Sequence, residues 1–167
     1  IGIISNCKTA LAELISQVSE TVDQNLVETR KTQVISDASS QRTAYEDSVR
    51  EKWNSIPISP ARMMSELAKS IPKNSIVVDD SISNRAAMRH YFPANERNDI
   101  RGVRGQSIGG GIGATMGTKC AFPDRPVLGI IGDGSAMMTV QGLWTAANDN
   151  IPCVFVICNN GMYRVLK

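Results

Sequence analysis

Several features that would assign a chain to a familiar class are absent from these 167 residues. No run of about 18 apolar residues occurs, which argues against a membrane-spanning helix. The 18 basic and 16 acidic residues give a net charge of only +2, too balanced to indicate binding to nucleic acid. Hydrophobic residues make up 42% and charged residues 20%, which excludes collagen, a disordered tail and a multi-pass membrane protein.

The cysteines and the amino terminus carry no strong signal of their own. Cys7, Cys120, Cys153 and Cys158 form no CxxC pair and have no metal-ligand spacing. Cys153 and Cys158 lie in an apolar run, where free cysteine behaves as a small buried hydrophobe. We therefore expect free thiols in a reducing, cytoplasmic compartment. The chain begins without methionine or a signal peptide, and we expect it to be a piece of a longer protein.

Charge and apolar spacing divide the chain into three stretches. In residues 1–27, a short apolar, strand-like beginning is followed by apolar residues at three- and four-residue intervals, typical of an amphipathic helix. The pair Ser5-Asn6, or Thr9, is a candidate cap for that helix. Residues 28–56 are densely charged, so we expect a solvated linker. Residues 57–167 contain long stretches with few charges and are expected to form the core of a second domain.

Residues 57–167 alternate between helix and strand signals. Ser59-Pro60 is a good helix start, with proline in the first helical position. We expect helices over 59–71, 83–91, 110–122 and 139–148, and apolar strands over 75–78, 127–131 and 153–158. Apolar strands separated by helices predict the α/β class, a parallel sheet flanked by helices on both faces. His90, the one histidine, is expected to have a surface or packing role. Met137 and Met138 are expected to belong to the core, with a substrate contact by Met137 as the alternative.

Glycine is concentrated in one segment. More than half of the 13 glycines fall between Gly102 and Gly117. The run Gly109-Gly110-Gly111-Ile112-Gly113 is only superficially like a dinucleotide fingerprint, because no clear strand precedes it. A helix packed tightly against its neighbour through glycines is an equally good interpretation. A nucleotide-binding domain that requires nicotinamide stays open as an alternative.

The strongest chemical signal comes from two motifs that follow expected strands. Gly132-Asp133-Gly134-Ser135 follows the strand at 127–131, and Asn159-Asn160 follows the next one. The carboxyl ends of parallel strands are where such sheets bind ligands. A carboxylate and an amide oxygen suit a hard cation such as Mg²⁺, and backbone amides at a helix start can donate to phosphate. The two motifs predict a site where Mg²⁺ bridges a bound diphosphate.

These motifs resemble the thiamin diphosphate signature of the decarboxylase and acetohydroxyacid synthase superfamily. Residues 132–167, with LWTAA, NIP and NNGxY, resemble its benzoylformate decarboxylase branch, as do DDSISNRAAM (79–88) and IGGGIGATMG (108–117). The resemblance implies that residues 1–27 end a central α/β domain and that 57–167 are an incomplete diphosphate-binding domain. It also implies that the glutamate that activates the cofactor lies in a pyrimidine-binding domain outside these residues. We therefore expect no catalytic side chain in this segment and no activity from it alone.

The resemblance also assigns site residues one at a time. The ligands of Mg²⁺ would be Asp133, the Asn160 side chain and the carbonyl of Met162. The expected cofactor contacts are Gly134 and Ser135 at the diphosphate, Ser83 near it, Ile108 as the bulky support for the bent cofactor, and the Gln106 carbonyl facing the aminopyrimidine. Gln106-Ser107 stands where the family commonly has two glycines.

The implied reaction is non-oxidative decarboxylation of a 2-oxo acid such as benzoylformate. In this family the ylid of thiamin diphosphate adds to the keto carbon, CO₂ leaves and an aldehyde is released. Two alternatives stay open: acetolactate synthase-type carboligation of 2-oxo acids, and a non-catalytic paralogue that binds the cofactor. The resemblance further implies a homodimer or homotetramer with a small-molecule substrate. We expect neither a nucleic acid nor a membrane as partner.

Overall fold

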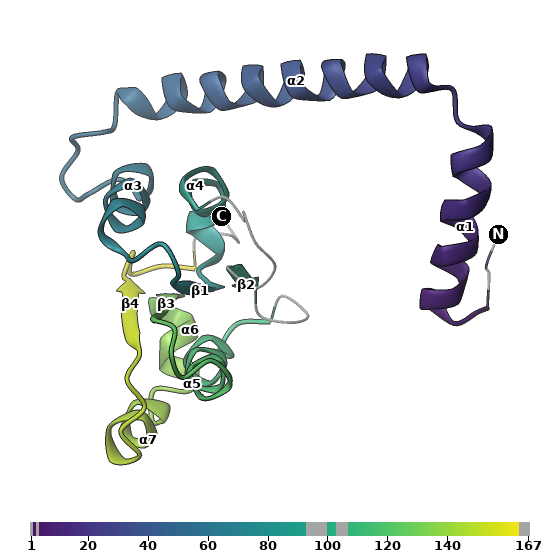
Figure 1. Cartoon of the computed structure of the whole chain (residues 1–167). Helices are drawn as coiled ribbons and strands as arrows, with labels where there is room; N and C mark the ends of the chain where they lie inside the picture. Colours follow the sequence, from purple (N-terminus) through teal and green to yellow (C-terminus); the bar gives the residue numbers. More distant parts are fainter. Residues whose placement is uncertain (1, 3, 93–99, 103–106, 164–167) are drawn as a thin grey trace. The chain divides into compact units, whose positions relative to one another are not determined.

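The computed structural model describes residues 2, 4–92, 100–102 and 107–163. The chain divides into two compact units, Ile1–Arg50 and Glu51–Lys167, each described here by itself (Figure 1). Within the described ranges, no helix combines the length and the apolar character needed to cross a membrane. The four cysteines are free thiols.

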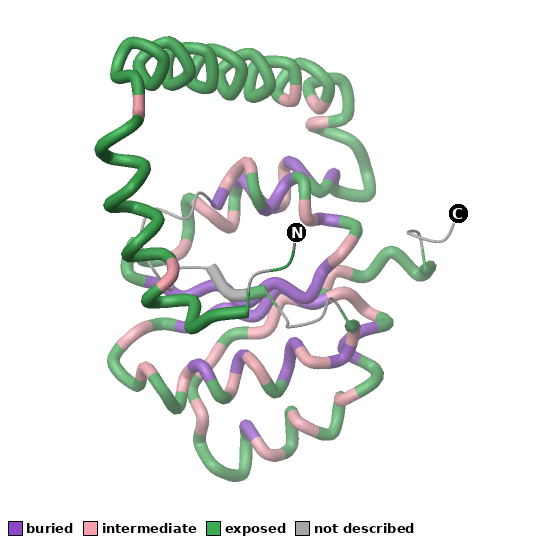
Figure 2. The backbone as a smooth tube through the Cα atoms, turned by 90° about the vertical axis from the view of Figure 1, so that its right-hand side faces the viewer, coloured by how far each residue is buried: buried purple, intermediate pink, exposed green. Residues whose placement is uncertain are grey.

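The first unit consists of two helices, α1 (Cys7–Thr21) and α2 (Gln24–Arg50), in which no residue is buried (Figure 2). Asn6 caps α1, because its side-chain oxygen accepts the backbone N–H groups of Lys8 and Thr9 at 3.1 and 3.4 Å. One of the two expected caps is thus confirmed. The expected strand-like beginning is not borne out, since the described residues 2 and 4–6 have no strand conformation.

Helix α2 occupies most of the charged stretch that we expected to be a linker. Ion pairs one helical turn apart line its exposed surface, including Arg42–Glu46 at 3.3 Å and Arg50–Asp47 at 2.8 Å. Exposed pairs of this kind stabilise a helix by only about 0.3 kcal/mol each. The stretch is therefore a polar helix rather than an irregular connection, and its linking role stays a prediction.

The second unit is built on a parallel sheet of four strands in the order β2-β1-β3-β4. The strands are β1 (Ile76–Asp80), β2 (Ile100–Gly102), β3 (Val127–Gly132) and β4 (Val154–Cys158). The α/β class and three of the strands are confirmed. Strand β2 was not predicted, and it corrects the expectation that no strand precedes the glycine run.

Helices cover both faces of this sheet, with α3 and α4 on one side and α5 and α6 on the other (Figure 1). The helical elements are α3 (Pro60–Ser70), the 3₁₀-helix η1 (Ile82–Asn84), α4 (Arg85–Tyr91), α5 (Gly111–Ala121), α6 (Asp133–Met138) and α7 (Gly142–Asn148). Ser59 caps α3 and Pro60 stands in its first turn, as expected. The helix expected over 139–148 begins at Gly142 instead. A separate helix that was not expected, α6, comes before it and directly follows β3.

The core lies on the two faces of β1 and β3, whose apolar residues are buried (Figure 2). Toward α3 and α4 the buried residues are Met64, Val77, Ala87, Met88, Phe92, Leu128 and Ile130. Toward α5 and α6 they are Ile76, Val78, Val127, Ile112, Ile131 and Ala136. Since successive strand residues point to opposite faces, this division also fixes the direction of polar residues at the strand ends.

An aromatic group packs beside α3 and α4. The Tyr91 ring lies 4.6 Å from the His90 ring, edge to face, and 6.2 Å from the Trp53 ring. The guanidinium of Arg62 lies 5.6 Å from the Trp53 ring centre. The expected packing role of His90 agrees with this contact.

Strand order places a topological switch point between β1 and β3. From β1 the chain moves outward to β2, then crosses back to β3 on the other side of β1 and continues to β4. In open parallel sheets the crevice outside the carboxyl ends of the strands at such a point is where ligands bind. The fold therefore directs attention to the residues that follow β1 and β3.

Candidate functional site

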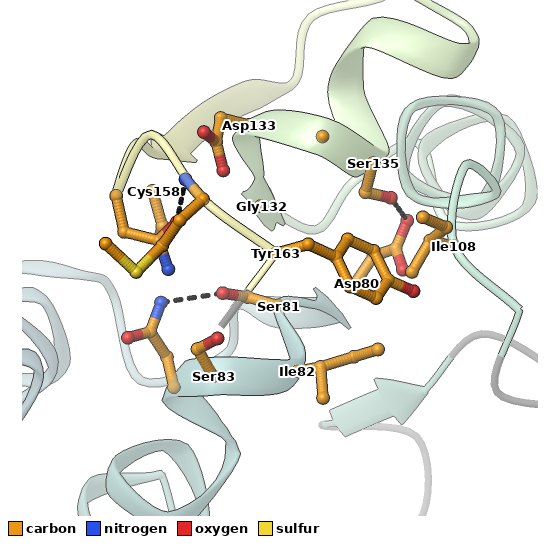
Figure 3. Close-up of a pocket in the computed structure, with 14 residues that line it drawn as sticks. Asp80, Ser81, Ile82, Ser83, Ile108, Gly132, Asp133, Ser135, Cys158 and Tyr163 are labelled. Atoms are coloured by element: carbon orange, nitrogen blue, oxygen red, sulfur yellow. Dashed lines mark hydrogen bonds between the residues drawn. The ribbon is translucent and has the colours of Figure 1, made fainter. Parts of the chain in front are cut away.

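A pocket of about 320 Å³ opens at the carboxyl ends of β1, β3 and β4 (Figure 3). Its walls come from the segment after β1, from the β3–α6 junction, from the segment after β4 and from the turn before α5. The lining residues are Asp80, Ser81, Ile82, Ser83, Asn84, Ile108, Gly132, Asp133, Gly134, Ser135, Cys158, Asn160, Met162 and Tyr163. Segments far apart in the sequence thus meet at the switch point.

With one exception, the site residues expected from the sequence line this pocket. They are Ser83, Ile108, Asp133, Gly134, Ser135, Asn160 and Met162. The exception, Gln106, lies outside the described residues. The structure brings these residues together, and their individual roles toward a cofactor or metal stay predictions.

Side-chain oxygens of the kind that bind metal ions lie where the turn after β4 meets the start of α6. The backbone N–H of Gly161 donates to Asp133 Oδ2 at 3.1 Å and to Asn159 Oδ1 at 3.0 Å. The N–H of Met162 donates to Asn160 Oδ1 at 3.0 Å. Gly161 has a φ of 61°, a left-handed conformation that glycine adopts without strain. A carboxylate, an amide and a main-chain carbonyl are the hard oxygen ligands that Mg²⁺ prefers, so the donor set fits that ion.

The backbone at Gly134 is open to the pocket. A Cβ placed on Gly134 would meet no atom within 4 Å. Gly134 and Ser135 lie in the first turn of α6, where backbone N–H groups have no partner within the helix. The Ser135 hydroxyl already donates to Asp80 and accepts the N–H of Gly109 at 2.7 Å. An anion in the pocket therefore fits the backbone amides rather than that hydroxyl.

Sequence reasoning missed half of the pocket, notably the residues directly after β1. Asp80 and Ser81 stand at the end of β1 as Asp133 stands at the end of β3, and both are buried. Asn84 donates to Ser81 Oγ at 2.6 Å. The sequence does carry a signal for them, since polar residues directly follow the apolar strand at 75–78. This kind of signal was used only for Asp133 and Asn160.

Asp79 and Asp80 point to opposite faces of β1. Asp79 faces α4: its Oδ1 accepts the Ser81 N–H at 3.0 Å, and its Oδ2 lies 3.7 Å from Arg85 Nε. Burial raises the pKa of Asp79 above its usual value of 3.8, while the Ser81 hydrogen bond and the Arg85 charge act in the opposite direction. Asp79 thus stands beneath the site without lining the pocket.

Asp79→Asn is expected to change how stability depends on pH. Because the pKa of Asp79 is raised in the folded state, folded protein binds this proton more tightly than unfolded protein. Its contribution to the free energy of unfolding is therefore fully present below the unfolded pKa, about 3.9, and is lost as pH rises through the folded pKa. Relative to wild type, the variant should gain stability over that window. Urea unfolding at a series of pH values measures the difference.

The exposed carboxylate Asp149 gives a control for this measurement, because Asp149→Asn removes a charge far less buried. The raised pKa would be contradicted if the free energy of unfolding of Asp79→Asn, minus that of wild type, stayed constant or fell with rising pH.

Comparison with known proteins agrees with this geometry. Residues 82–167 match the family described as thiamine pyrophosphate enzyme, C-terminal TPP binding domain. The chain is 33% identical over 111 residues to benzoylformate decarboxylase of Pseudomonas aeruginosa, covering 66% of this chain and 21% of that protein. It is 30% identical over 172 residues to a Methanococcus aeolicus protein named "Probable acetolactate synthase large subunit", covering 96% and 28%.

A solved structure is similar as well. The thiamine diphosphate-dependent 4-hydroxybenzoylformate decarboxylase of Rhodococcus jostii RHA1 superposes with a TM-score of 0.63 and 34% identity, covering 65% of this chain and 21% of that one. The chain thus spans between about a fifth and just over a quarter of these relatives' length. The resemblance predicted from the two strand-end motifs is confirmed. The chain belongs to the thiamine pyrophosphate enzymes and carries their C-terminal TPP-binding domain.

Proposed function

We propose that the protein carrying this chain uses thiamin diphosphate and Mg²⁺ to decarboxylate a 2-oxo acid such as benzoylformate, giving an aldehyde and CO₂. One observation carries the proposal: the pocket at the switch point combines an oxygen-donor set, open backbone at Gly134 and an apolar wall at Ile108. The names of two relatives, which specify benzoylformate and 4-hydroxybenzoylformate, support the choice of an aryl 2-oxo acid.

The chain's own residues would bind and orient the cofactor. Asp133, the Asn160 amide and the Met162 carbonyl would hold Mg²⁺ against the diphosphate. The backbone amides of Gly134 and Ser135 would donate to phosphate oxygens, with Ser83 beside them. When bound, the thiazolium ring supplies the electron sink for the carbanion chemistry. These assignments place the polar half of the cofactor near α6.

Ile108 and Gln106 are proposed to act on the other half of the cofactor. Ile108 would support the bent conformation from its place in the pocket wall, and the Gln106 carbonyl would face the aminopyrimidine. The side chains of this wall would also keep water away from the reacting atoms.

Carboligation of two 2-oxo acids is the second candidate. It is favoured by the extent of the acetolactate synthase-type match, which covers 96% of this chain, whereas the benzoylformate decarboxylase match covers 66%. Both reactions begin with the same decarboxylation and differ in what accepts the resulting carbanion. The pocket described here serves either.

Product analysis separates the two candidates. The full protein, supplied with thiamin diphosphate and Mg²⁺, is offered benzoylformate and pyruvate in separate reactions. Benzaldehyde with CO₂ from benzoylformate is the expected result. Formation of acetolactate from pyruvate would instead show that the protein is a carboligase. Turnover of neither, with cofactor bound, would favour the non-catalytic cofactor-binding alternative.

We also propose that the protein is a homodimer or homotetramer of the cytoplasm. The expectation that Met137 and Met138 belong to the core is wrong, since they are 69% and 57% exposed, and Trp144 nearby is 70% exposed. Exposed large apolar side chains at neighbouring positions in the sequence favour contact with another protein surface, here a second copy. Free exposed thiols at Cys7 and Cys120 agree with a reducing compartment. Light scattering of the full protein measures its oligomeric state.

Thiol labelling should report pocket occupancy without any turnover. Burial raises the pKa of both Cys153 and Cys158, so iodoacetamide at neutral pH is expected to modify them more slowly than the exposed Cys7 and Cys120. Cys158 lines the pocket, whereas Cys153 precedes the opposite end of β4. Added thiamin diphosphate with Mg²⁺ should therefore slow labelling of Cys158 alone, as followed by mass spectrometry. Equal protection of Cys153 would point to a general tightening of the fold instead.

A further inference from the structure

We propose that Asp80 is the positioning residue that fixes the turn at Gly109, and with it Ile108, against the start of α6. The inference rests on the proposed function, because it concerns the wall that would support the cofactor. Asp80 ends β1 and lines the pocket, yet no ligand role was expected for it from the sequence.

One oxygen of Asp80 collects hydrogen bonds from two other segments. Asp80 Oδ2 accepts the backbone N–H of Gly111 at 2.8 Å and that of Gly109 at 3.3 Å. The Ser135 hydroxyl donates to the same oxygen (Figure 3). A single carboxylate therefore joins β1 to the glycine turn and to α6.

Ser135 completes the connection. Its Oγ accepts the N–H of Gly109 at 2.7 Å while donating to Asp80. The carbonyl of Gly109 is bound as well, because Thr139 Oγ1 donates to it at 2.8 Å. Both polar groups of the Gly109 backbone are thus bound by residues of α6 or its C-terminal end. We call Asp80, Ser135 and Gly109 the turn anchor.

The turn anchor is closely packed, and its two side chains are almost fully buried. Asp80 is 4% exposed and Ser135 is 5% exposed. A Cβ on Gly111 would lie 2.7 Å from the Cβ of Asp80, and a Cβ on Gly109 would lie 3.0 Å from that of Met138. Gly109 also has a φ of 100°, which side chains rarely adopt. The two glycines are therefore required by the close approach of Asp80 and α6.

A buried carboxylate is suited to this task. Hydrogen bonds to an ionised acceptor are shorter and stronger than those between neutral groups, and they strengthen where water is excluded. Ile108 precedes Gly109 directly, so its place in the pocket wall depends on the turn that Asp80 holds. Without this acceptor, the buried N–H groups of Gly109 and Gly111 would each lose a partner, and the turn would be free to move.

Two near-isosteric variants test the inference. Asp80→Leu removes the acceptor, while Asp80→Asn keeps a side-chain oxygen at the same position. Asp79→Asn is the matched control, since Asp79 is the neighbouring buried carboxylate on the opposite face of the sheet. All three are made in the full protein.

Hydrogen exchange is the first readout and needs no cofactor. In Asp80→Leu, amide exchange in residues 107–113 should rise by about 100-fold while β3 stays protected, as expected for local rather than global opening. Asp80→Asn should recover much of the protection, and Asp79→Asn should leave local opening of residues 107–113 as in wild type. Unchanged exchange in Asp80→Leu would overturn the inference.

The second readout is the split between binding and turnover. With the diphosphate contacts intact, Asp80→Leu should lower kcat by about 100-fold, the scale of a misplacement near 1 Å, with a smaller change in the Kd of thiamin diphosphate. Faster exchange with unchanged kcat would also overturn the positioning role. If wild-type protein binds no thiamin diphosphate, the proposed function fails, and the exchange result still decides whether Asp80 holds the turn.

If Asp80→Leu does not fold, a variant at Ser135 still tests the inference. Ser135→Ala removes only the bridging hydroxyl. Exchange should rise at Gly109, which loses its 2.7 Å bond and keeps only the longer 3.3 Å bond to Asp80. Exchange should stay slow at Gly111, whose 2.8 Å bond to Asp80 remains. Equal rises at both residues would contradict the arrangement of the turn anchor.

Discussion

Gly134→Val is expected to abolish thiamin diphosphate binding in the full protein without unfolding it. A Cβ at this position meets no atom within 4 Å, so the backbone there has room for a side chain. Because Gly134 lines the pocket, that side chain would occupy the space proposed for the diphosphate. We expect the affinity, measured by isothermal titration calorimetry, to fall by at least about 100-fold, or roughly 2.8 kcal/mol.

Gly117→Val is the matched control for this variant. Gly117 is also an exposed helical glycine with no atom within 4 Å of a Cβ, and it does not line the pocket. In a helix, valine is favoured over glycine by about 0.3 kcal/mol, so both variants should unfold close to the wild-type temperature. Wild-type affinity in Gly134→Val would remove this pocket as the cofactor site, whatever the fold.

The parts of the site that the sequence predicted are those carried by local signals. Strands buried on both faces consist almost entirely of apolar residues, as β3 does. Strand β4 has the same apolar composition, although its residues are only partly covered or exposed. Asp133 and Asn160 follow these strands directly. The general rule that ligands bind at strand carboxyl ends then places the two residues together, without knowledge of any contact between them.

Other parts depend on contacts between distant segments and leave little local trace. Strand β2 has three residues, and its conformation follows from pairing with β1 rather than from an apolar run. The break between α6 and α7 falls at Thr139, whose hydroxyl bonds the carbonyl of Gly109. Gly142, the first residue of α7, is the one local sign of this break, whereas the helix was expected to start at Thr139.

Asp80 shows the same limitation most clearly. Its partners lie between 29 and 55 residues away along the chain, so spacing alone gives no reason to join them. Glycine density was the only sign of a close approach, and both a packed helix and a ligand against bare backbone fitted it. The structure supports close packing, since a Cβ on Gly111 would lie 2.7 Å from the Cβ of Asp80. A ligand lying against the backbone of this segment stays a prediction.

Asp133→Ala is expected to remove the dependence of cofactor binding on Mg²⁺. Asp133 supplies the one carboxylate among the proposed ligands, and Mg²⁺ binding to proteins usually relies on one or two carboxylates. Without it, thiamin diphosphate should bind about 100-fold more weakly, and adding Mg²⁺ should no longer improve the affinity. The variant also loses an acidic residue in the first turn of α6 and the bond from Gly161, costing about 1 kcal/mol of stability.

Two adjacent asparagines separate metal binding from turn geometry. Asn159 and Asn160 each accept a backbone N–H two residues ahead, at 3.0 Å, but only Asn160 lines the pocket. Substituting either with alanine removes one such bond, so the cost to the turn should be similar. Asn160→Ala should lose Mg²⁺-dependent affinity as Asp133→Ala does, and Asn159→Ala should keep it. Equal losses in both asparagine variants would mean that the turn, rather than a ligand at Asn160, carries the effect.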